Sequence, residues 1–245
     1  MELEGMVAVI TGAAQGQGES HARLLLSRGA RVVVTDIQEE RGRALVGELG
    51  AGALFVRHDV TSEEDWTHVV SATEHTFGPA TVLVNNAGLD LIKSVEDTTL
   101  VDYRRVVDIN QVGTFLGIRA IAPSMRAAGG GSIINISSIG GIHTNAKLRI
   151  AYVAAKHAVR GMTKAAAVDL APDGIRVNSI HPGFVDTEMF RAAAIPPERI
   201  ASQIPLGRPA AIAEISELVA FLASSRSSYI TASEHLIDGG YSGGF

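Results

Sequence analysis

The chain has 245 residues, of which 46% are hydrophobic and 19% are charged, a composition that excludes intrinsic disorder. Its 21 Lys and Arg against 26 Asp and Glu give a net charge of −5, which argues against nucleic acid as a partner. The absence of cysteine excludes disulfides, zinc fingers and thiol catalysis and suits a reducing cytoplasm. The longest apolar runs, such as Leu218–Ala223, are too short to span a membrane. We therefore expect a cytoplasmic protein with neither a nucleic-acid nor a membrane partner.

Short apolar runs alternate with longer stretches of helical periodicity along the chain. The expected strands are Val7–Thr11, Arg31–Asp36, Ala53–His58, Thr81–Asn85, Ser132–Ser137, Arg176–His181 and Glu234–Ile237. The expected helices are Gly16–Arg28, Glu39–Leu49, Ser62–Phe77, Leu100–Asn110, Val112–Ala127, Ala151–Leu170 and Ala211–Ala223. Strands that read as continuous Val, Ile and Leu runs are typical of parallel sheets buried on both faces. The pattern predicts an α/β, doubly wound Rossmann fold with helices on both faces of a seven-stranded parallel sheet.

No repeat, low-complexity segment or linker divides the sequence, so we expect one domain over residues 1–245. Only residues 183–208 break the rhythm, with three prolines (Pro196, Pro197 and Pro205) among apolar residues. A long insertion after the carboxyl end of a strand is typical of a lid or binding loop. We therefore expect a substrate lid here; the alternative is a surface helix pair with a structural role.

A glycine-rich segment, Thr11-Gly12-Ala13-Ala14-Gln15-Gly16-Gln17-Gly18, lies between the first expected strand and helix. Glycines let the backbone approach a pyrophosphate closely, and the N-terminus of the following helix favours negative charge. The strand–loop–helix context is what makes such a motif informative. The segment predicts a dinucleotide site formed by Gly12, Gln15, Gly16, Gln17 and Gly18.

The second expected strand ends on a carboxylate, Asp36. A carboxylate at this place accepts hydrogen bonds from the adenosine ribose of NAD and repels the 2′-phosphate of NADP. No Arg or Lys stands at the neighbouring positions Gln15, Gln17, Thr35 and Ile37, and we expect Arg41 and Arg43 to lie too far along the next helix. We therefore predict NAD as cofactor, with Asp36 and Ile37 beside the ribose. The alternative is that Asp36 only caps the next helix.

Tyr152 and Lys156 are four residues apart and share one face of an expected helix. A tyrosine pKa near 10 is too high for a base at neutral pH, but a nearby ammonium and a positive nicotinamide ring lower it. We expect Tyr152 to be the general acid/base of an alcohol–ketone interconversion, with Lys156 tuning it and holding the nicotinamide ribose. Ser138, at the carboxyl end of the fifth expected strand, is placed to donate to the substrate oxygen. Ser137 is the alternative if the strand register differs.

With these motifs in this order, the chain resembles the short-chain dehydrogenase/reductase family, and within it bacterial 3α/20β-hydroxysteroid dehydrogenases and related secondary-alcohol dehydrogenases. The resemblance covers nearly the whole chain and includes Asn85-Asn86-Ala87-Gly88, Asp59-Val60, Tyr152-Val153-Ala154-Ala155-Lys156 and Pro182-Gly183 with Thr187. It implies that Asp59 and Val60 hold the adenine and that Asn86, Ala87 and Gly88 lie beside the cofactor. It also implies a nicotinamide loop formed by Pro182, Gly183, Val185 and Thr187.

The same resemblance implies that Asn110 holds a water linking Lys156 to solvent. It further implies a homotetramer, because family members pair the two long helices (here Val112–Ala127 and Ala151–Leu170) and the C-terminal strand region across two-fold interfaces. No metal is expected, since the histidines show no ligand spacing.

The substrate is less determined than the chemistry. The loop Ile139–Ala151 is one residue longer than is usual in the family. It carries four polar residues, His143, Asn145, Lys147 and Arg149. These side chains either face water or contact a polar group of the substrate. The residues expected to line the pocket are apolar: Leu89, Leu91, Ile142, Phe184, Met189 and Phe190. We predict an NAD-dependent oxidoreductase that interconverts a secondary alcohol and its ketone, with a largely apolar small-molecule substrate such as an aryl alcohol or hydroxysteroid. The alternatives are a 3-oxoacyl carrier-protein reductase, against which Asp36 and the net charge count, and a non-catalytic NAD(H)-sensing protein.

Overall fold

The computed structural model describes residues 2–143, 147–187 and 197–244. Its framework is a seven-stranded sheet in the order β3-β2-β1-β4-β5-β6-β7. The strands are β1 (Val7–Thr11), β2 (Arg31–Asp36), β3 (Ala53–Arg57), β4 (Val82–Asn85), β5 (Gly131–Ile136), β6 (Ile175–Pro182) and β7 (Glu234–Ile237). All neighbouring strands are parallel. Because parallel strands end at one edge of a sheet, the loops after β1, β4, β5 and β6 gather there.

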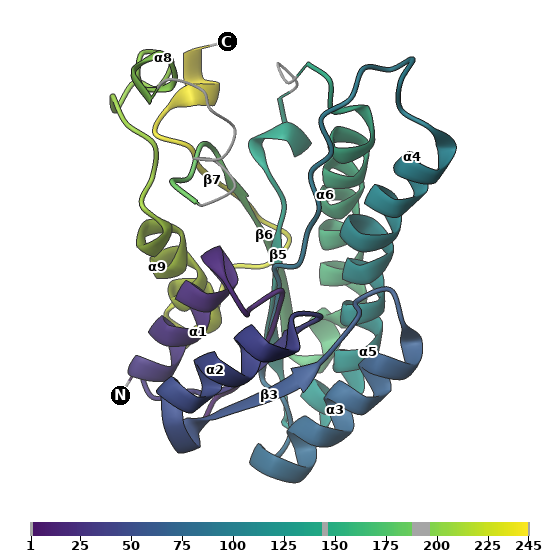
Figure 1. Ribbon diagram of the computed structural model, residues 1–245. Helices are drawn as coiled ribbons and strands as arrows, with labels where there is room; N and C mark the ends of the chain where they lie inside the picture. Colours follow the sequence, from purple (N-terminus) through teal and green to yellow (C-terminus); the bar gives the residue numbers. More distant parts are fainter. Residues whose placement is uncertain (1, 144–146, 188–196, 245) are drawn as a thin grey trace.

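Helices cover both faces of the sheet (Figure 1). One layer contains α1 (Gly16–Ser27), α2 (Glu39–Leu49) and α9 (Ile212–Ala223); the other contains α3 (Glu63–Phe77), α5 (Gly113–Ala127) and α6 (Ile150–Leu170). The helix α4 (Leu100–Val107) packs on α6, and the short α8 (Pro197–Ala201) lies near the C-terminus. Within the described ranges, no helix has both the length and the apolar composition to cross a membrane. The arrangement confirms the doubly wound α/β fold.

Successive residues along a strand belong to two separate apolar cores. In β1, Ala8 and Ile10 pack with α1 and α9, whereas Val9 packs into the opposite core with Trp66 of α3 and Met125 of α5. All five side chains are fully buried. Burial on both faces explains why the strands read as continuous apolar runs.

The expected element boundaries are met to within about one residue, except between α4 and α5. The sequence predicted a helix ending at Asn110 and another starting at Val112. Instead, α4 continues through a π-helical turn (Asp108–Val112) into α5, so Asn110 lies inside a continuous helix. A π turn adds a residue to the helical repeat, and a periodicity of 3.6 does not reveal it.

The described part of the expected lid packs against the C-terminal segment. The ring of Phe184, after β6, meets the ring of Tyr241, after β7, edge to face with centres 5.2 Å apart. Ile200 and Ile204 complete this apolar cluster, and Ile139, after β5, borders it. The cluster therefore joins three loops at the carboxyl edge of the sheet.

Three histidines, His21, His58 and His181, are buried. His21, on α1, hydrogen-bonds through Nδ1 to the Ser216 hydroxyl of α9 at 2.8 Å. Burial lowers the pKa of His21 to about 3 and the pKa values of His58 and His181 to about 4. An unfolded histidine has a pKa of about 6.5, so the folded protein keeps all three rings neutral where the unfolded chain binds protons.

We predict that mild acid destabilises the protein through these rings. Their contribution is fully present above about pH 6.5 and is lost as the pH falls, by about 1.4 kcal/mol per pH unit for each histidine, because only the unfolded state takes up the protons. Urea unfolding at about pH 7.5 and about pH 5.5 measures this dependence. His21→Gln should reduce the slope, whereas replacing the exposed His68 by Gln should not. Equal slopes for the wild type and His21→Gln would contradict the prediction.

Candidate active site

The loop between β1 and α1 is a tight glycine cradle. Gly12 and Gly16 have left-handed backbones, each with φ of +61°. A Cβ on Gly12 would lie 2.8 Å from the Cα of Ala87, and a Cβ on Gly18 would collide with the Gly12 carbonyl oxygen. Nothing lies within 4 Å of the position where Gly16 would carry a Cβ, so the backbone there is open to a ligand.

The N-terminus of α1 offers hydrogen-bond donors to this cradle. Its N-cap residue, Gln15, is extended and makes no side-chain cap hydrogen bond. The Oε1 atom of Gln17 is buried without a hydrogen-bond partner in the described part of the chain. Uncapped N–H groups and open backbone fit the diphosphate of a dinucleotide, whereas the unpaired Gln17 Oε1 is an acceptor and needs a donor such as a hydroxyl.

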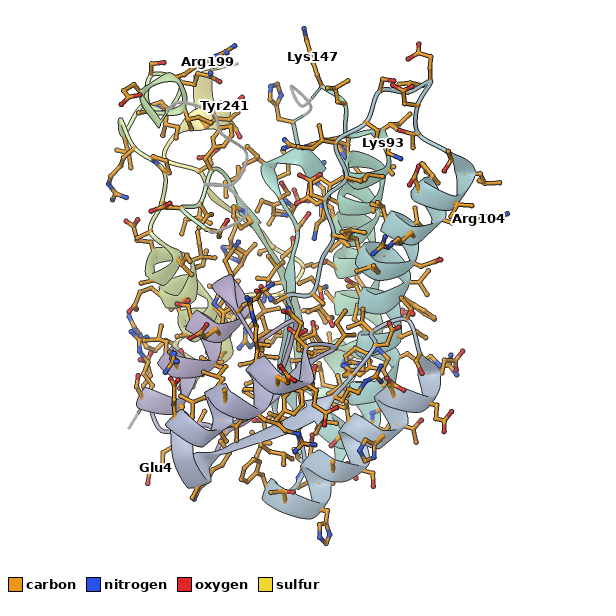
Figure 2. All side chains as sticks on the ribbon, in the orientation of Figure 1. Glu4, Lys93, Arg104, Lys147, Arg199 and Tyr241 are labelled. Carbon is orange, nitrogen blue, oxygen red and sulfur yellow. The ribbon has the colours of Figure 1, made fainter. Side chains whose placement is uncertain are left out.

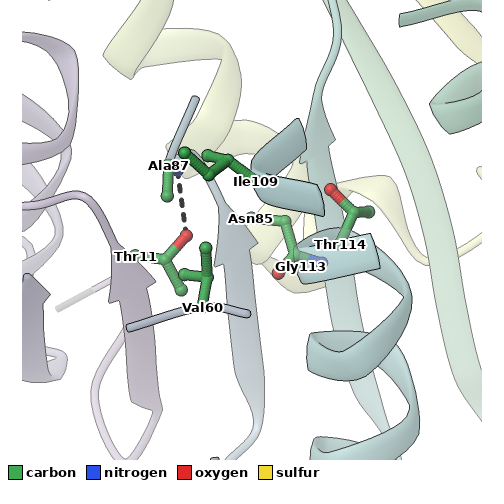
Figure 3. A pocket seen from close by; sticks show the side chains of 7 residues that line it. All are labelled: Thr11, Val60, Asn85, Ala87, Ile109, Gly113 and Thr114. Carbon is green, nitrogen blue, oxygen red and sulfur yellow. Dashed lines mark hydrogen bonds between the residues drawn. The ribbon is translucent and has the colours of Figure 1, made fainter. Parts of the chain in front are cut away.

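The asparagine motif after β4 fixes the cradle in place. Thr11 Oγ1 accepts hydrogen bonds of 3.0 Å from the N–H groups of Asn86 and Ala87, and Figure 3 shows the bond to Ala87. Asn86 Nδ2 donates to the carbonyl oxygens of Thr11 and Gly12. Val60 lines the same small pocket as Thr11 and Ala87 (Figure 3). The structure thus brings two predicted cofactor-binding segments to the glycine loop.

The two carboxylates predicted to hold the adenosine are tied to backbone N–H groups. Asp36 is buried; its Oδ2 accepts from Ala14 of the glycine loop at 3.1 Å, and its Oδ1 accepts from Gln38 at 3.0 Å. Asp59 accepts from the N–H and the hydroxyl of Thr61. Asp36 therefore fixes the glycine loop relative to β2 as well as providing negative charge.

A cation lies closer to this corner than the sequence suggested. Arg41 donates a hydrogen bond to the Gln15 side chain, and both residues line an open groove with Ala14 and Gly16. Ile37, at the same corner, is 63% exposed. The expectation that Arg41 is too distant is wrong, because it lies in the first turn of α2, beside the start of α1.

Ser138, Tyr152 and Lys156 converge at the carboxyl edge of the sheet. Ser138 follows β5, and its hydroxyl accepts a hydrogen bond from the Gly140 N–H at 3.0 Å. Tyr152, in the first turn of α6, is hydrogen-bonded to Ser138. One turn further on, the buried Lys156 Nζ donates to the Ile136 carbonyl at 2.8 Å and lies 5.5 Å from the centre of the Tyr152 ring.

Burial dominates the titration of both groups. It raises the pKa of Tyr152 above its usual value of 10, and the hydrogen bond from Ser138 opposes this rise. It lowers the pKa of Lys156 to about 8, against the attraction of Asp90. The lowered tyrosine pKa expected from Lys156 is therefore absent in the protein alone, because loss of solvation outweighs the opposing interactions.

The strand register decides between the two adjacent serines, and the π turn decides the contacts of Asn110. Ser137 is buried, and its hydroxyl donates to the Lys156 carbonyl at 3.0 Å, which leaves Ser138 beside Tyr152.

Asn110 Nδ2 donates to the Leu89 carbonyl at 2.8 Å. A Cβ on Gly88 would lie 2.9 Å from Asn110 Oδ1 and 3.6 Å from Lys156 Nζ. Glycine at position 88 thus lets the backbone lie against both polar groups.

The predicted nicotinamide loop lies at the same edge. Pro182 ends β6, and a Cβ on Gly183 would lie 2.8 Å from the Cα of Asp238, which follows β7. Val185 is buried and its carbonyl accepts from the Thr187 N–H at 2.8 Å.

The predicted substrate-pocket residues come from three loops. Leu89 and Leu91 follow β4, Ile142 follows β5 and Phe184 follows β6, and all four are half-buried. Met189 and Phe190 lie outside the described residues, as does Asn145. In the polar loop, Lys147 is exposed, whereas Arg149 pairs with Asp90.

Sequence reasoning missed three residues at this edge. Asp90 Oδ2 lies 3.0 Å from Arg149 Nε, and Tyr241 packs on Phe184. His181 Nδ1 lies 3.0 Å from the Ser138 carbonyl, so this buried ring holds the main chain of Ser138. Only His181 had a usable signal, namely its place beside Pro182 at the carboxyl end of a strand.

Comparison with known proteins agrees with this geometry. A family model described as enoyl-(acyl carrier protein) reductase matches residues 12–242. The trans-4-hydroxycyclohexanecarboxylate dehydrogenase of Sinomonas cyclohexanicum is 49% identical over 97% of this chain and 93% of its own. The 3-alpha-(or 20-beta)-hydroxysteroid dehydrogenase of Mycobacterium bovis is 48% identical over 97% and 90%, and the cyclopentanol dehydrogenase of a Comamonas species is 42% identical over 96% of each chain.

The chain therefore belongs to the short-chain dehydrogenase/reductase family. It is an oxidoreductase of that family that acts on alcohols and uses a nicotinamide cofactor, NAD or NADP.

Proposed function

We propose that this protein is an NAD-dependent dehydrogenase that interconverts an alicyclic secondary alcohol and its ketone, with Tyr152 as general acid/base. The observation that carries the proposal is the hydrogen bond between Tyr152 and Ser138 with the buried Lys156 ammonium 5.5 Å from the ring centre. The names of the three relatives support the substrate class, since each denotes a secondary alcohol on or attached to a saturated ring system. Half-buried apolar side chains at the same edge suit such a ring.

The proposed chemistry divides between the cofactor and side chains of this chain. A bound nicotinamide supplies the hydride acceptor for oxidation and the hydride donor for reduction. Tyr152 takes the proton of the substrate hydroxyl, and the Ser138 hydroxyl donates to the same oxygen and stabilises the charge that develops on it. The ammonium of Lys156 favours the phenolate that burial disfavours. Asn110 holds Leu89 and so keeps the adjoining backbone against Lys156.

Replacing Tyr152 by Phe tests the acid/base assignment. We expect kcat for alcohol oxidation to fall by about a thousandfold, because no other group takes the proton, while NADH binding is nearly unchanged. Initial rates and NADH fluorescence titration measure the two effects. Tyr229→Phe, at a fully exposed tyrosine, is the matched control and should behave as the wild type. Substantial residual activity of Tyr152→Phe would refute the assignment.

The preference for NAD is proposed from Asp36. Its buried carboxylate accepts from Ala14 N–H at the corner where an adenosine ribose would lie, and an anion there opposes a 2′-phosphate. Arg41, which donates a hydrogen bond to the Gln15 side chain, acts in the opposite direction, because its positive charge attracts a 2′-phosphate and so favours NADP. Asp36 outweighs it in this proposal because the carboxylate is buried, where charge interactions are less screened.

We predict opposite changes in cofactor preference from these two charges. Asp36→Ala should lower the ratio of kcat/KM for NAD to that for NADP by about tenfold or more, and Arg41→Ala should raise it. Asp36→Asn, which keeps the shape of the side chain, separates loss of charge from loss of the bond to Ala14. A ratio that Asp36→Ala and Asp36→Asn both leave unchanged would remove Asp36 from cofactor selection.

We further propose a homotetramer. Large apolar side chains are exposed at Phe115 of α5 (48%), Val168 of α6 (72%) and Leu236 of β7 (49%), on the elements that the family pairs across two-fold axes. Light scattering should give four times the chain mass of 25.7 kDa. Phe115→Glu and Leu236→Glu should each yield dimers, because each disrupts one interface. A monomeric wild type would contradict this assembly.

A further inference from the structure

The carbonyl oxygen of Ser138 is held by a side chain from the neighbouring strand. His181, the last residue but one of β6, lies 3.0 Å from this oxygen through Nδ1, and its Nε2 lies 2.8 Å from the Ser179 hydroxyl. The ring is fully buried, and burial lowers its pKa to about 4, so it is neutral at neutral pH. A carbonyl oxygen only accepts, so Nδ1 carries the proton and Nε2 accepts from Ser179.

The ring of His181 lies on the face of the sheet that carries the acid/base. Ile180 packs in the core beside α1 and α9, so the alternation along β6 places His181 on the opposite face, which α6 covers. The first turn of α6 carries Tyr152. Figure 2 marks this end of the molecule by Tyr241, which follows β7, and Lys147, which precedes α6. The histidine therefore supports the catalytic edge from within the sheet.

The hydrogen bond from His181 fixes the turn that follows Ser138. Ser138 is the N-cap of a 3₁₀ turn, Ile139–Gly141, and its carbonyl oxygen also accepts from the Gly141 N–H at 2.9 Å. Its hydroxyl accepts from the Gly140 N–H at 3.0 Å. A Cβ on Gly141 would lie 2.7 Å from a carbonyl oxygen of α6, so the turn is packed closely against that helix. The turn is thus held by α6 on one side and by His181 of β6 on the other.

The position of this turn decides where the Ser138 hydroxyl points. The Gly140 N–H occupies one acceptor position of the hydroxyl and leaves its proton for another acceptor. A Cβ on Gly140 would lie 3.5 Å from Ser138 Oγ and 3.8 Å from Tyr152 Cε1, so the hydroxyl and the ring lie beside the same side of Gly140. A shift of the turn moves the hydroxyl relative to the oxygen that Tyr152 deprotonates, and a misplacement of about 1 Å costs up to about a hundredfold in rate.

We propose that His181 is a positioning residue for catalysis, which acts through the main chain of Ser138 to aim the Ser138 hydroxyl at the substrate oxygen. This inference rests on the proposed dehydrogenase function, in which Ser138 donates to that oxygen. The donor on Nδ1 of His181 carries the effect, and the Ser179 hydroxyl selects the tautomer that has this donor. His181 itself transfers no proton.

Two substitutions separate the two nitrogens of the ring. His181→Asn keeps a donor near the place of Nδ1 and loses the contact with Ser179, whereas His181→Gln keeps an amide near the place of Nε2 and loses the donor to Ser138. The probes are cyclopentanol, cyclohexanol, trans-4-hydroxycyclohexanecarboxylate and a 3α-hydroxysteroid, each assayed with NAD and with NADP. With the best probe, kcat per NADH-binding site should stay within about threefold of the wild type in His181→Asn and fall about tenfold in His181→Gln, with KM for the alcohol nearly unchanged. His181→Met, a second variant without a donor, should fall as far and replaces His181→Gln if the latter does not fold.

A double-mutant cycle distinguishes positioning from support of the fold. Ser138→Ala should lower kcat by about a hundredfold, because it removes the donor to the developing charge. Adding His181→Gln to Ser138→Ala should lower kcat by less than about twofold further, because no hydroxyl is left to aim. A loss of about tenfold from His181→Gln in both backgrounds would show support of the fold alone and overturn the proposal.

The matched control is His21→Gln. His21 is also fully buried and bonds through Nδ1 to the Ser216 hydroxyl at 2.8 Å, between α1 and α9, and its replacement should leave kcat per NADH-binding site unchanged. Wild-type kcat in His181→Gln or in Ser138→Ala, or a loss of about tenfold in His181→Asn, would overturn the positioning role and leave the proposed dehydrogenase standing. Turnover of no probe with either cofactor would instead overturn the proposed function, and the positioning role with it.

Discussion

A chain of buried amide and hydroxyl hydrogen bonds sets the geometry on which the rest of the site depends. Asn85 Nδ2, at the end of β4, donates to Asn135 Oδ1 of β5 at 2.8 Å, and Asn135 Nδ2 donates to Thr163 Oγ1 of α6 at 2.9 Å. All three side chains are buried, so an unpaired group would be costly, and this fixes how β4, β5 and α6 lie relative to one another. The same three elements carry the asparagine motif, the serine and the Tyr–Lys pair.

Burial has opposite consequences at the two ends of the site. At the cofactor end, the carboxylate of Asp36 is taken up by two backbone N–H groups, so its negative charge is held in a fixed place. At the catalytic end, loss of solvation raises the pKa of Tyr152 and lowers that of Lys156, which moves both away from a charged phenolate–ammonium pair. In the proposed mechanism, the positive charge of a bound oxidised nicotinamide would act against this effect of burial and favour the phenolate.

Loops form the substrate side of the site, and individual pairs of side chains hold these loops to neighbouring segments. Phe184 and Tyr241 join the loops after β6 and β7, and Asp90 and Arg149 join the loop after β4 to the start of α6. Ser138 at the end of β5 and Tyr152 and Lys156 on α6 are thus held by regular elements, whereas contacts between loops shape the surface beside them. This division is consistent with relatives that share the fold but are named for different ring alcohols.

The sequence by itself determined the parallel sheet, the glycine cradle and the Tyr–Lys spacing, because these depend on short-range patterns. Continuous apolar runs report burial on both faces, and positions four apart on a helix share a side wherever the helix lies. Only the tertiary structure decided that Ser138 rather than Ser137 meets Tyr152, that Asn110 lies in a π turn, that Arg41 reaches Gln15, and that Arg149 pairs with Asp90. Most of these contacts join segments far apart in the chain, and the π turn adds one residue to a regular repeat. Neither a long-range contact nor a π turn leaves a periodic signal in the sequence. Both depend on how the segments pack in three dimensions, which the spacing of residues along the chain does not specify.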